Sequence, residues 1–450
     1  MARARTSFVC SECGQAEPKW QGRCPGCGAW NTMAEERLAR GPAQGAPAGA
    51  VRALRDVDAV AVRRLATGIG ELDRVLGGGL VPGSLVLIGG APGVGKSTLT
   101  TMALANLAAA GRRVLYVSAE ESPAQVRLRA ERLLPAALDV PVLAETSLEA
   151  VIATLEAERP EACVVDSVQT LHAGDLSGAP GSVGQVREAA AAIMRVAKAS
   201  GTAVLLVGHV TKEGALAGPR VLEHLVDCVL QFEGERERTY RTVRAHKNRF
   251  GSVDETGVFE MRDAGLVEVL DASARFVADA TRAPGSVVLA AMEGTRPLLV
   301  EVQALVGESE LVPPRRVVSG IDRNRLALVL AVLARHGGLG LGTSDVFVNV
   351  VGGVRIDEPG ADLAVALAVT GAARGATLAG GPLACFGEIG LTGELRTVAH
   401  ADRRAAEARK FGLQPVIGPA GSGATEAATL REALRLALPR PDRMPRSEAA

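Results

Sequence analysis

The chain has 450 residues, of which 47% are hydrophobic and 22% are charged, and its formal net charge is zero. This length predicts about three domains, with cores large enough to need no disulfide support. Zero net charge excludes a protein that holds nucleic acid by bulk charge alone, so any such binding must come from local patches.

The first residues, MARARTSFVC, are basic but contain no apolar run of signal-peptide length. The longest apolar stretches elsewhere are rich in alanine and carry charges at helical spacing, so none is predicted to span a membrane. These patterns predict a cytoplasmic protein with no membrane partner.

Four of the seven cysteines form two C-x-x-C pairs, Cys10 with Cys13 and Cys24 with Cys27, separated by ten residues. Four thiolates at this spacing predict a closed tetrahedral zinc site within residues 1–32. Disulfides would need an oxidising compartment, and a C-x-x-C redox pair would need a βαβ context that this segment lacks. Structural zinc is therefore the favoured interpretation.

After a linker at residues 33–60, which is rich in proline and glycine, apolar segments alternate with helical patterns. Apolar strands alternating with helices indicate an α/β fold with a parallel sheet covered on both faces. Two further strands, 227–233 and 239–246, look like antiparallel additions. The main strands are predicted at residues 84–90, 113–118, 162–166 and 202–208, and the helices at 97–110, 123–134, 147–158 and 183–200.

Residues 90–97, GAPGVGKS, fit the phosphate-loop pattern and lie between a predicted strand and a predicted helix. The glycines let backbone N–H groups surround phosphate oxygens, and the helix N-terminus favours the same negative charge. Lys96 is predicted to reach the β- and γ-phosphates of ATP, and the Ser97 hydroxyl to bind Mg²⁺. A plain glycine turn is the weaker alternative. The candidate ATP-binding residues are Gly90, Ala91, Pro92, Gly93, Val94, Gly95, Lys96, Ser97 and Thr98.

Carboxylates follow two of the predicted strands. Asp166 ends the strand at 162–166, where a carboxylate that supports Mg²⁺ from outside its direct ligands is expected, and a helix N-cap is the alternative. Glu120 and Glu121 follow the strand at 113–118, so one of them could orient the attacking water at the carboxyl edge of the sheet. Glu120 is favoured because it comes first after the strand, and solvated surface carboxylates are the alternative.

Beyond residue 275 helices and strands follow in mixed order, which predicts a separate α+β domain. Its expected elements include helices at 322–335, 361–374 and 400–411 and a glycine-rich strand pair around 384–396.

Several segments together resemble the bacterial RadA (Sms) family of DNA-repair ATPases, and the resemblance covers nearly the whole chain. The two most specific segments are GHVTKEGALAGPRVLEH at 208–224 and KNRFG at 247–251. The resemblance implies a RecA-like ATPase domain at 61–270 and a Lon-protease-like domain at 275–450. The other matching segments are the four-cysteine module, 67–84, the phosphate loop, 116–122, 166–170 and 181–188.

The resemblance also implies an activity. Family members form hexameric rings that hydrolyse ATP, move along single-stranded DNA and process branched recombination intermediates together with the RecA recombinase. By motif, Glu120 matches the catalytic glutamate, and His209 matches the polar sensor that couples the γ-phosphate to the DNA loop.

Lys247 and Arg249 in KNRFG are candidates for cations that act on ATP held by a neighbouring subunit. Strand alternation predicts that their side chains share one face. A solvated pair of charges at a strand end is the alternative, which the resemblance makes less probable.

Two glycine-rich loops, 171–185 and 210–220, are predicted to leave the same edge of the sheet. Arg187, Lys212 and Arg220 could contact DNA phosphates there, although ordinary surface charge is an equal alternative for each. Neither loop contains Phe, Tyr or Trp, so we expect backbone tracking with little sequence readout.

The Lon-like region lacks the residues of a serine–lysine peptidase. Gly360 and Ala361 occupy the place of the nucleophile, and no serine occurs between Ser344 and Ser422. The segment HADRR at 400–404 carries arginine where lysine is needed, and arginine does not deprotonate. We therefore expect a fold without protease chemistry that serves oligomerisation and DNA binding.

Three functions remain to be compared. The leading one is a DNA-stimulated ATPase motor, which rests on the phosphate loop and the two candidate loops. An ATP-dependent Lon-type peptidase fails on the missing serine and lysine. A nucleotide-gated, clock-like kinase ring shares TGIGELD at 67–73 and the phosphate loop, but the zinc module and KNRFG do not favour it.

Overall fold

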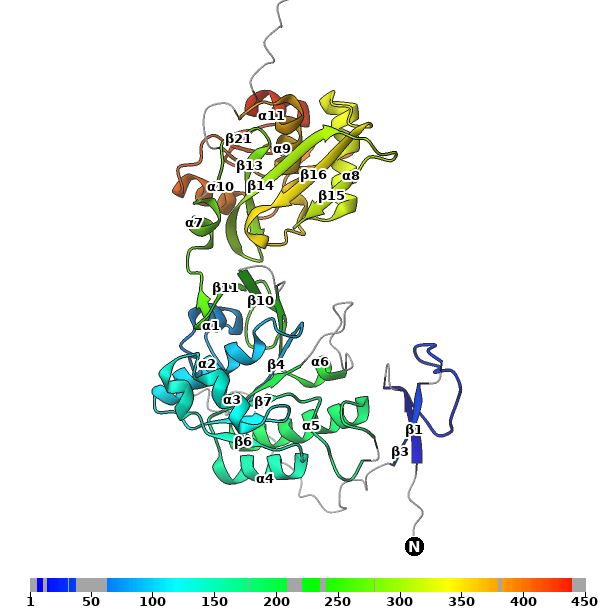
Figure 1. The fold of residues 1–450 in the computed structure, drawn as a ribbon, viewed down its shortest axis with the longest axis vertical. Helices are drawn as coiled ribbons and strands as arrows, with labels where there is room; N and C mark the ends of the chain where they lie inside the picture. Colours follow the sequence, from blue (N-terminus) through cyan, green and yellow to red (C-terminus); the bar gives the residue numbers. More distant parts are fainter. Residues whose placement is uncertain are drawn as a thin grey trace, which may run out of the picture. The chain divides into compact units, whose positions relative to one another are not determined.

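Figure 1 shows a computed structural model of the chain. The structure describes residues 6–10, 14–30, 32–37, 63–176, 178–208, 221–234, 240–278, 280–378 and 383–438. Contacts divide the chain into two compact units: residues 1–237 with 241–268, and residues 238–240 with 269–450. No helix in the described ranges is both long and apolar enough to cross a membrane.

The N-terminal module is a small antiparallel sheet of β1 (Thr6–Cys10), β2 (Ala16–Glu17) and β3 (Met33–Arg37), in the order β2-β1-β3. Among the described residues of the module, the buried cluster contains Cys10, Cys24 and Met33, with Phe8 packed against them. So few apolar side chains do not stabilise an independent fold. A module of this size therefore needs a structural metal or disulfides to stay folded.

The nucleotide-binding core is built on a nine-stranded sheet in the order β12-β11-β10-β9-β4-β8-β7-β5-β6. The central strands are buried on both faces, so their sequences lack polar alternation. The parallel strands are β4 (Leu85–Gly90), β5 (Val114–Ser118), β6 (Val142–Ala144), β7 (Ala162–Asp166), β8 (Ala203–Val207) and β9 (Cys228–Glu233).

The sheet is completed by β10 (Tyr240–Asn248), β11 (Thr256–Arg262) and β12 (Gly265–Glu268). β10 runs antiparallel to β9, and β11 antiparallel to β12. The prediction that residues 227–233 form an antiparallel addition is wrong, because β9 pairs parallel with β4. The crossover that permits this pairing contains α6 (Val221–Leu225), which is too short to give a clear periodic signal.

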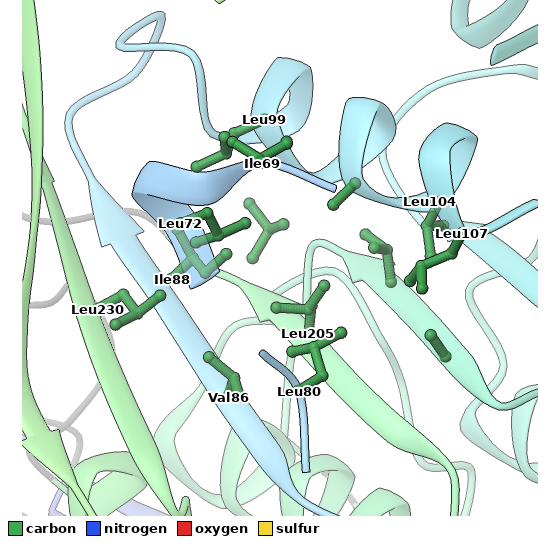
Figure 2. Close-up of a cluster of buried hydrophobic side chains, with 14 of the residues drawn as sticks. Ile69, Leu72, Leu80, Val86, Ile88, Leu99, Leu104, Leu107, Leu205 and Leu230 are labelled. Carbon is green, nitrogen blue, oxygen red and sulfur yellow. The ribbon is translucent and has the colours of Figure 1, made fainter. Parts of the chain in front are cut away.

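Helices cover both faces of this sheet. One core cluster joins α1 (Gly70–Leu76) and α2 (Lys96–Ala109) to one set of strand residues, and Figure 2 shows part of it. A second cluster joins α4 (Leu148–Glu158) and α5 (Val183–Ser200) to the alternate strand residues. The remaining helices of the core are α3 (Pro123–Ala130), which begins at a Ser122 capping box, and the 3-10 helix Pro135–Asp139.

The C-terminal unit is an α+β fold on a seven-stranded mixed sheet in the order β15-β16-β14-β13-β17-β20-β21. These strands are β13 (Ser286–Glu293), β14 (Arg296–Glu308), β15 (Arg316–Ser319), β16 (Ser344–Val350), β17 (Ala384–Cys385), β20 (Val416–Gly418) and β21 (Thr425–Glu426). The strand pair expected near 384–396 contains β18 (Glu388–Ile389) and β19 (Leu395–Arg396).

The helices of this unit are α7 (Ala272–Val277), α8 (Arg323–Val332), α9 (Asp362–Arg374), α10 (Ala401–Lys410) and α11 (Leu430–Ala437). Short 3-10 helices occur at Val351–Gly353 and Pro359–Ala361, and a π turn at Leu333–Gly337 extends α8. The predicted helices at 322–335, 361–374 and 400–411 are therefore confirmed.

Candidate functional site

The phosphate loop connects the central strand β4 to α2, and its glycines are sterically required. A Cβ at Gly90 would lie 2.6 Å from the carbonyl oxygen of Phe232 on the neighbouring strand. Gly95 has a φ of +116°, and a Cβ there would lie 2.8 Å from the Met261 methyl group. Larger residues at these two positions would displace the loop from the helix N-terminus that it precedes.

Lys96 lies in the first turn of α2 and is buried. Its Nζ donates hydrogen bonds to the carbonyl oxygens of Gly90 at 2.7 Å and Ala91 at 3.1 Å. Burial lowers the pKa of Lys96 below its ordinary 10.5, and the charges of Asp166 and Glu120 partly oppose that shift. The ammonium group is thus held at the loop by weak carbonyl partners that phosphate oxygens could replace.

The loop opens into a cavity of about 220 Å³ at the carboxyl ends of β4, β5 and β7. Seven of the residues predicted from the sequence meet there, and Lys96, Ser97, Glu120 and Asp166 are those with polar side chains assigned to catalysis or Mg²⁺. The complete lining is Gly93, Gly95, Lys96, Ser97, Thr98, Glu120, Glu121, Arg129, Asp166 and Met261. A hydroxyl and a carboxylate facing one polar cavity are the hard oxygen ligands that suit Mg²⁺, so these residues fit the ion.

Asp166 is fixed by a chain of side chains that the sequence analysis did not include. The Tyr116 hydroxyl donates to Asp166 Oδ2 at 2.6 Å, and Arg129 Nη2 donates to the Tyr116 hydroxyl at 2.8 Å. Burial, together with the charge of Asp166, raises the pKa of Tyr116 well above 10.0, so the phenol keeps its proton. A tyrosine in a mostly apolar strand was the available signal, because a buried hydroxyl needs a partner.

The two glutamates after β5 have different partners. Glu121 forms an ion pair with Arg129, and its backbone oxygen accepts a 2.7 Å hydrogen bond from Ser118 Oγ. Glu120 accepts a hydrogen bond from the Ser167 hydroxyl and remains exposed at the mouth of the cavity. The Arg129 pairing therefore separates Glu121 from Glu120, which keeps its carboxylate directed to the cavity.

KNRFG and the phosphate loop lie at opposite ends of the strands of the core sheet. In β9, Phe232 is level with Gly90, whereas Cys228 is level with Val86 of β4 and with Asn248 of β10. The carboxyl-terminal end of β10 is therefore level, across β9, with the amino-terminal end of β4. Within one subunit, the two sites are separated by the length of a strand.

The cations of KNRFG have partners inside the subunit. Lys247 Nζ donates to the carbonyl oxygens of Glu223 at 2.6 Å and Val226 at 2.8 Å, and Arg249 Nη1 pairs with Asp227 at 3.0 Å. The prediction that alternation places the two side chains on one face does not apply, because β10 ends at Asn248. A register shift between Ala245 and Lys247 also interrupts the alternation.

The first glycine-rich loop is organised by Gln185, which is buried in the first turn of α5. Its amide accepts from Ala173 N at 2.7 Å and donates to three loop carbonyls, those of Ala173, Leu176 and Gly178. Arg187 follows on α5 and is exposed. The other predicted loop residues, His209, Lys212 and Arg220, lie outside the residues that the structure describes.

Three of the four predicted zinc ligands converge in the N-terminal module. The sulfurs of Cys10, Cys24 and Cys27 lie within 4.8 Å of one another, and Cys13 lies outside the described residues. Both knuckles have the same backbone form: Gly14 N donates to Cys10 O and Gly28 N to Cys24 O, each at 2.9 Å. These thiol sulfurs fit zinc, which prefers tetrahedral sulfur ligation.

In the C-terminal unit, a buried ion pair lies beside Gly360, one of the residues that the sequence analysis compares with the nucleophile of a Lon-type peptidase. Arg404 is fully buried and pairs with Glu358 through two nitrogens, while its Nη1 also donates to Ala290 O at 2.9 Å. A Cβ at Gly360 would lie 3.0 Å from Arg404 Nη1. The guanidinium therefore fills the space beside Gly360.

The fold and the site together define a P-loop nucleotide-binding protein that carries an N-terminal zinc ribbon. Residues 51–215 match the family model described as an AAA domain, and residues 8–35 match the model described as a rubredoxin metal binding domain.

The chain also matches DNA repair protein RadA of several bacteria over nearly its full length. It is 53% identical to RadA of Pseudomonas aeruginosa over 436 residues, covering 95% of each chain. It is 46% identical to RadA of Bacillus subtilis over 458 residues, covering 97% of this chain and 100% of the relative. It is 48% identical to RadA of Escherichia coli over 435 residues, covering 94% of each. The chain therefore belongs to the RadA family of DNA repair proteins, as its motifs predict.

Proposed function

We propose that this protein is a DNA-stimulated ATPase of recombinational DNA repair, which moves along single-stranded DNA and processes branched recombination intermediates. The observation that carries the proposal is the separation of two half-sites: a complete phosphate cavity at one edge of the sheet and the KNRFG cations at the other. In a ring of identical subunits, the phosphate cavity of each subunit would face one neighbour and its KNRFG cations would face the other.

In this proposal, each residue of the cavity has one task in ATP hydrolysis. Lys96 leaves the Gly90 and Ala91 carbonyls to bind the β- and γ-phosphates, and the loop N–H groups hold the remaining oxygens. Ser97 and Asp166 hold Mg²⁺, which when bound neutralises charge on the phosphates. Glu120 orients the attacking water and accepts its proton, while Tyr116 and Arg129 keep Asp166 and Glu121 in place.

Lys247 and Arg249 act on the ATP of the adjacent subunit. A cation that enters from a neighbour stabilises the charge that develops on the transferred phosphoryl group. Lys247 holds the carbonyls at the end of α6, and the chain leading into α6 comes directly from the second glycine-rich loop. This connection supports coupling between the KNRFG segment and the DNA loop, with His209 as the sensor at the end of β8.

The proposed partners are single-stranded and branched DNA, the RecA recombinase and further copies of this chain in a hexameric ring. Arg187, Lys212 and Arg220 are the proposed phosphate contacts in the ring channel. We place the protein in the cytoplasm, with ATP, Mg²⁺ and Zn²⁺ as its cofactors. The proposed domains are 1–32, the linker 33–60, the ATPase at 61–270 and the Lon-like platform at 275–450, which lacks a peptidase dyad.

Mixing two inactive variants tests the proposal. Lys96→Ala and Arg249→Ala should each lose DNA-stimulated ATP hydrolysis. When rings of the two variants are dissociated into subunits and reassembled together, some subunit interfaces pair an intact Lys96 with an intact Arg249. ATP turnover by the mixture should therefore rise above that of either variant alone. Two results would contradict the proposal: an ATP hydrolysis rate of the unaltered protein that single-stranded DNA does not raise, or a mixture of variants that hydrolyses ATP no faster than either variant alone.

A further inference from the structure

The zinc module carries two exposed tryptophans, and they are the only tryptophans in the chain. Trp20 is 56% exposed and Trp30 is 70% exposed. One exposed apolar side chain is ordinary, but two large aromatic rings gathered on a module this small mark a binding surface.

The two indole rings lie against the same residue, Gly22. A Cβ built at Gly22 would lie 3.6 Å from Trp20 Cη2 and 3.8 Å from Trp30 Cζ3. Because glycine has no side chain, nothing from residue 22 covers these two ring edges. The two exposed indoles therefore offer apolar ring surface next to Gly22.

A cation lies beside the Trp30 ring, and a second one neighbours Trp20 in the sequence. Arg23 and Trp30 pair across an isolated antiparallel bridge, which places the Arg23 guanidinium 5.8 Å from the centre of the Trp30 ring. A 3.0 Å hydrogen bond from Arg23 Nε to Gly28 O fixes that orientation. Lys19 directly precedes Trp20 and is exposed. Indole faces next to an arginine and a lysine are the combination that binds bases by stacking and phosphates by charge.

We propose that Trp20 and Trp30 form a base-stacking site for single-stranded DNA. The identity of the partner rests on the proposed function. The glycine-rich loops at 171–185 and 210–220 contain no Phe, Tyr or Trp, so they offer phosphate contacts without stacking. The zinc module supplies the stacking surface that those loops lack, and it holds the bases while the core holds the backbone.

The natural protein contains its own probe for this site. Because Trp20 and Trp30 are the only tryptophans, the tryptophan fluorescence of the full chain, excited at a wavelength that tyrosine does not absorb, reports on this surface alone. Oligothymidylate should quench that fluorescence, whereas an abasic strand of the same length should not. The anisotropy of a dye on each strand, measured in parallel, reports total binding by every site.

Variants complete the test. Trp20→Ala and Trp30→Ala should each weaken oligothymidylate binding at least about five-fold. Trp20→Phe and Trp30→Phe should keep most of the affinity, because phenylalanine still stacks. Zinc content checks that the module stays folded, and Leu128→Ala, which removes an exposed apolar side chain from α3, is the surface control and should bind as the unaltered protein does.

Four results would overturn the inference. Strand binding seen by anisotropy with unchanged tryptophan fluorescence would exclude this surface and leave the proposed function standing. Alanine variants that bind like the unaltered protein would do the same. A fluorescence change caused by RecA but not by oligothymidylate would assign the surface to a protein partner, and no strand binding at all would reject both proposals.

Discussion

Tyr116 is the residue on which the position of Asp166 depends. It is buried in β5 and links Asp166 to Arg129, and Arg129 in turn pairs with Glu121. One phenol thus connects a carboxylate on β7 with the ion pair between Glu121, which precedes α3, and Arg129 in the last turn of that helix. The phosphate-loop motif predicted Lys96 and Ser97, but no local pattern predicts a contact between side chains 50 residues apart.

Tyr116→Phe removes this link without changing the shape of the core. Asp166 loses a 2.6 Å hydrogen bond, so we expect weaker Mg²⁺ binding by about 1 kcal/mol, or about a five-fold higher Mg²⁺ concentration for half-maximal ATP hydrolysis. Tyr240→Phe is the matched control, because Tyr240 is the chain's other tyrosine and accepts from Arg275 in the C-terminal unit. Equal Mg²⁺ dependence in the two variants would contradict the role of Tyr116.

At the scale of elements, the positions of the core strands and helices were predictable from the sequence, but the direction of β9 was not. Long apolar strands such as 162–166 and strongly periodic helices such as 183–200 lie where the sequence predicts them. The direction of β9 was wrong, because direction depends on what the preceding crossover contains rather than on the strand's own residues. The site followed the same rule: loop residues with a motif were found, and the partners that fix them were not.

The buried pair of Arg404 on α10 and Glu358 before α9 connects two elements of the C-terminal unit. Arg404→Ala leaves Glu358 without its main partner in a largely apolar surrounding. We expect this variant to lose about 3–5 kcal/mol of unfolding free energy in the C-terminal unit. Urea unfolding followed by circular dichroism measures it.

Arg403→Ala is the control for this variant, because Arg403 is the neighbouring arginine on α10 and is exposed. It should change the unfolding free energy by less than about 1 kcal/mol. If the two alanine variants unfold at the same urea concentration, the Arg404 pair does not stabilise the unit.

Asp345 connects the start of β16 to the segment before β15. Hydrogen bonds from Ser309 and from Arg315 lower the pKa of Asp345 from 3.8 to about 2. Because the folded pKa lies below the unfolded one, this carboxylate contributes its stability above pH 3.8 and loses it as the pH falls toward 2.

Asp345→Asn should therefore reduce stability at neutral pH and flatten its decline between about pH 4 and pH 2. Acid unfolding followed by circular dichroism checks this, with Asp402→Asn on the exposed face of α10 as the control. An acid limb with the same slope as that of the unaltered protein would rule out the Asp345 contribution.

At the scale of the whole molecule, the zinc module and the nucleotide-binding core have separate sources of stability. The module buries only a few side chains around its cysteines, whereas each face of the core sheet has an extensive apolar cluster. The stability of the module therefore depends on metal ligation, whereas the stability of the core does not.

Cys24→Ser should abolish zinc binding and unfold the module while basal ATP hydrolysis is retained. Metal analysis of the purified protein measures zinc, and a coupled assay without DNA measures hydrolysis. Cys163→Ala, in the buried strand β7, is the contrasting variant: it should keep zinc and lower the stability of the core. Full zinc occupancy in Cys24→Ser would exclude the four-cysteine site.

The placement of KNRFG and the phosphate loop at opposite edges of one sheet has a genetic consequence. In the proposed ring, each polypeptide would contribute to two different reaction centres, and neither contribution would work without an adjoining copy. A defective allele that still assembles would interrupt rings made mostly of intact copies. In a cell that expresses both alleles, the damage should exceed the fraction of altered protein, so such mutations should be dominant.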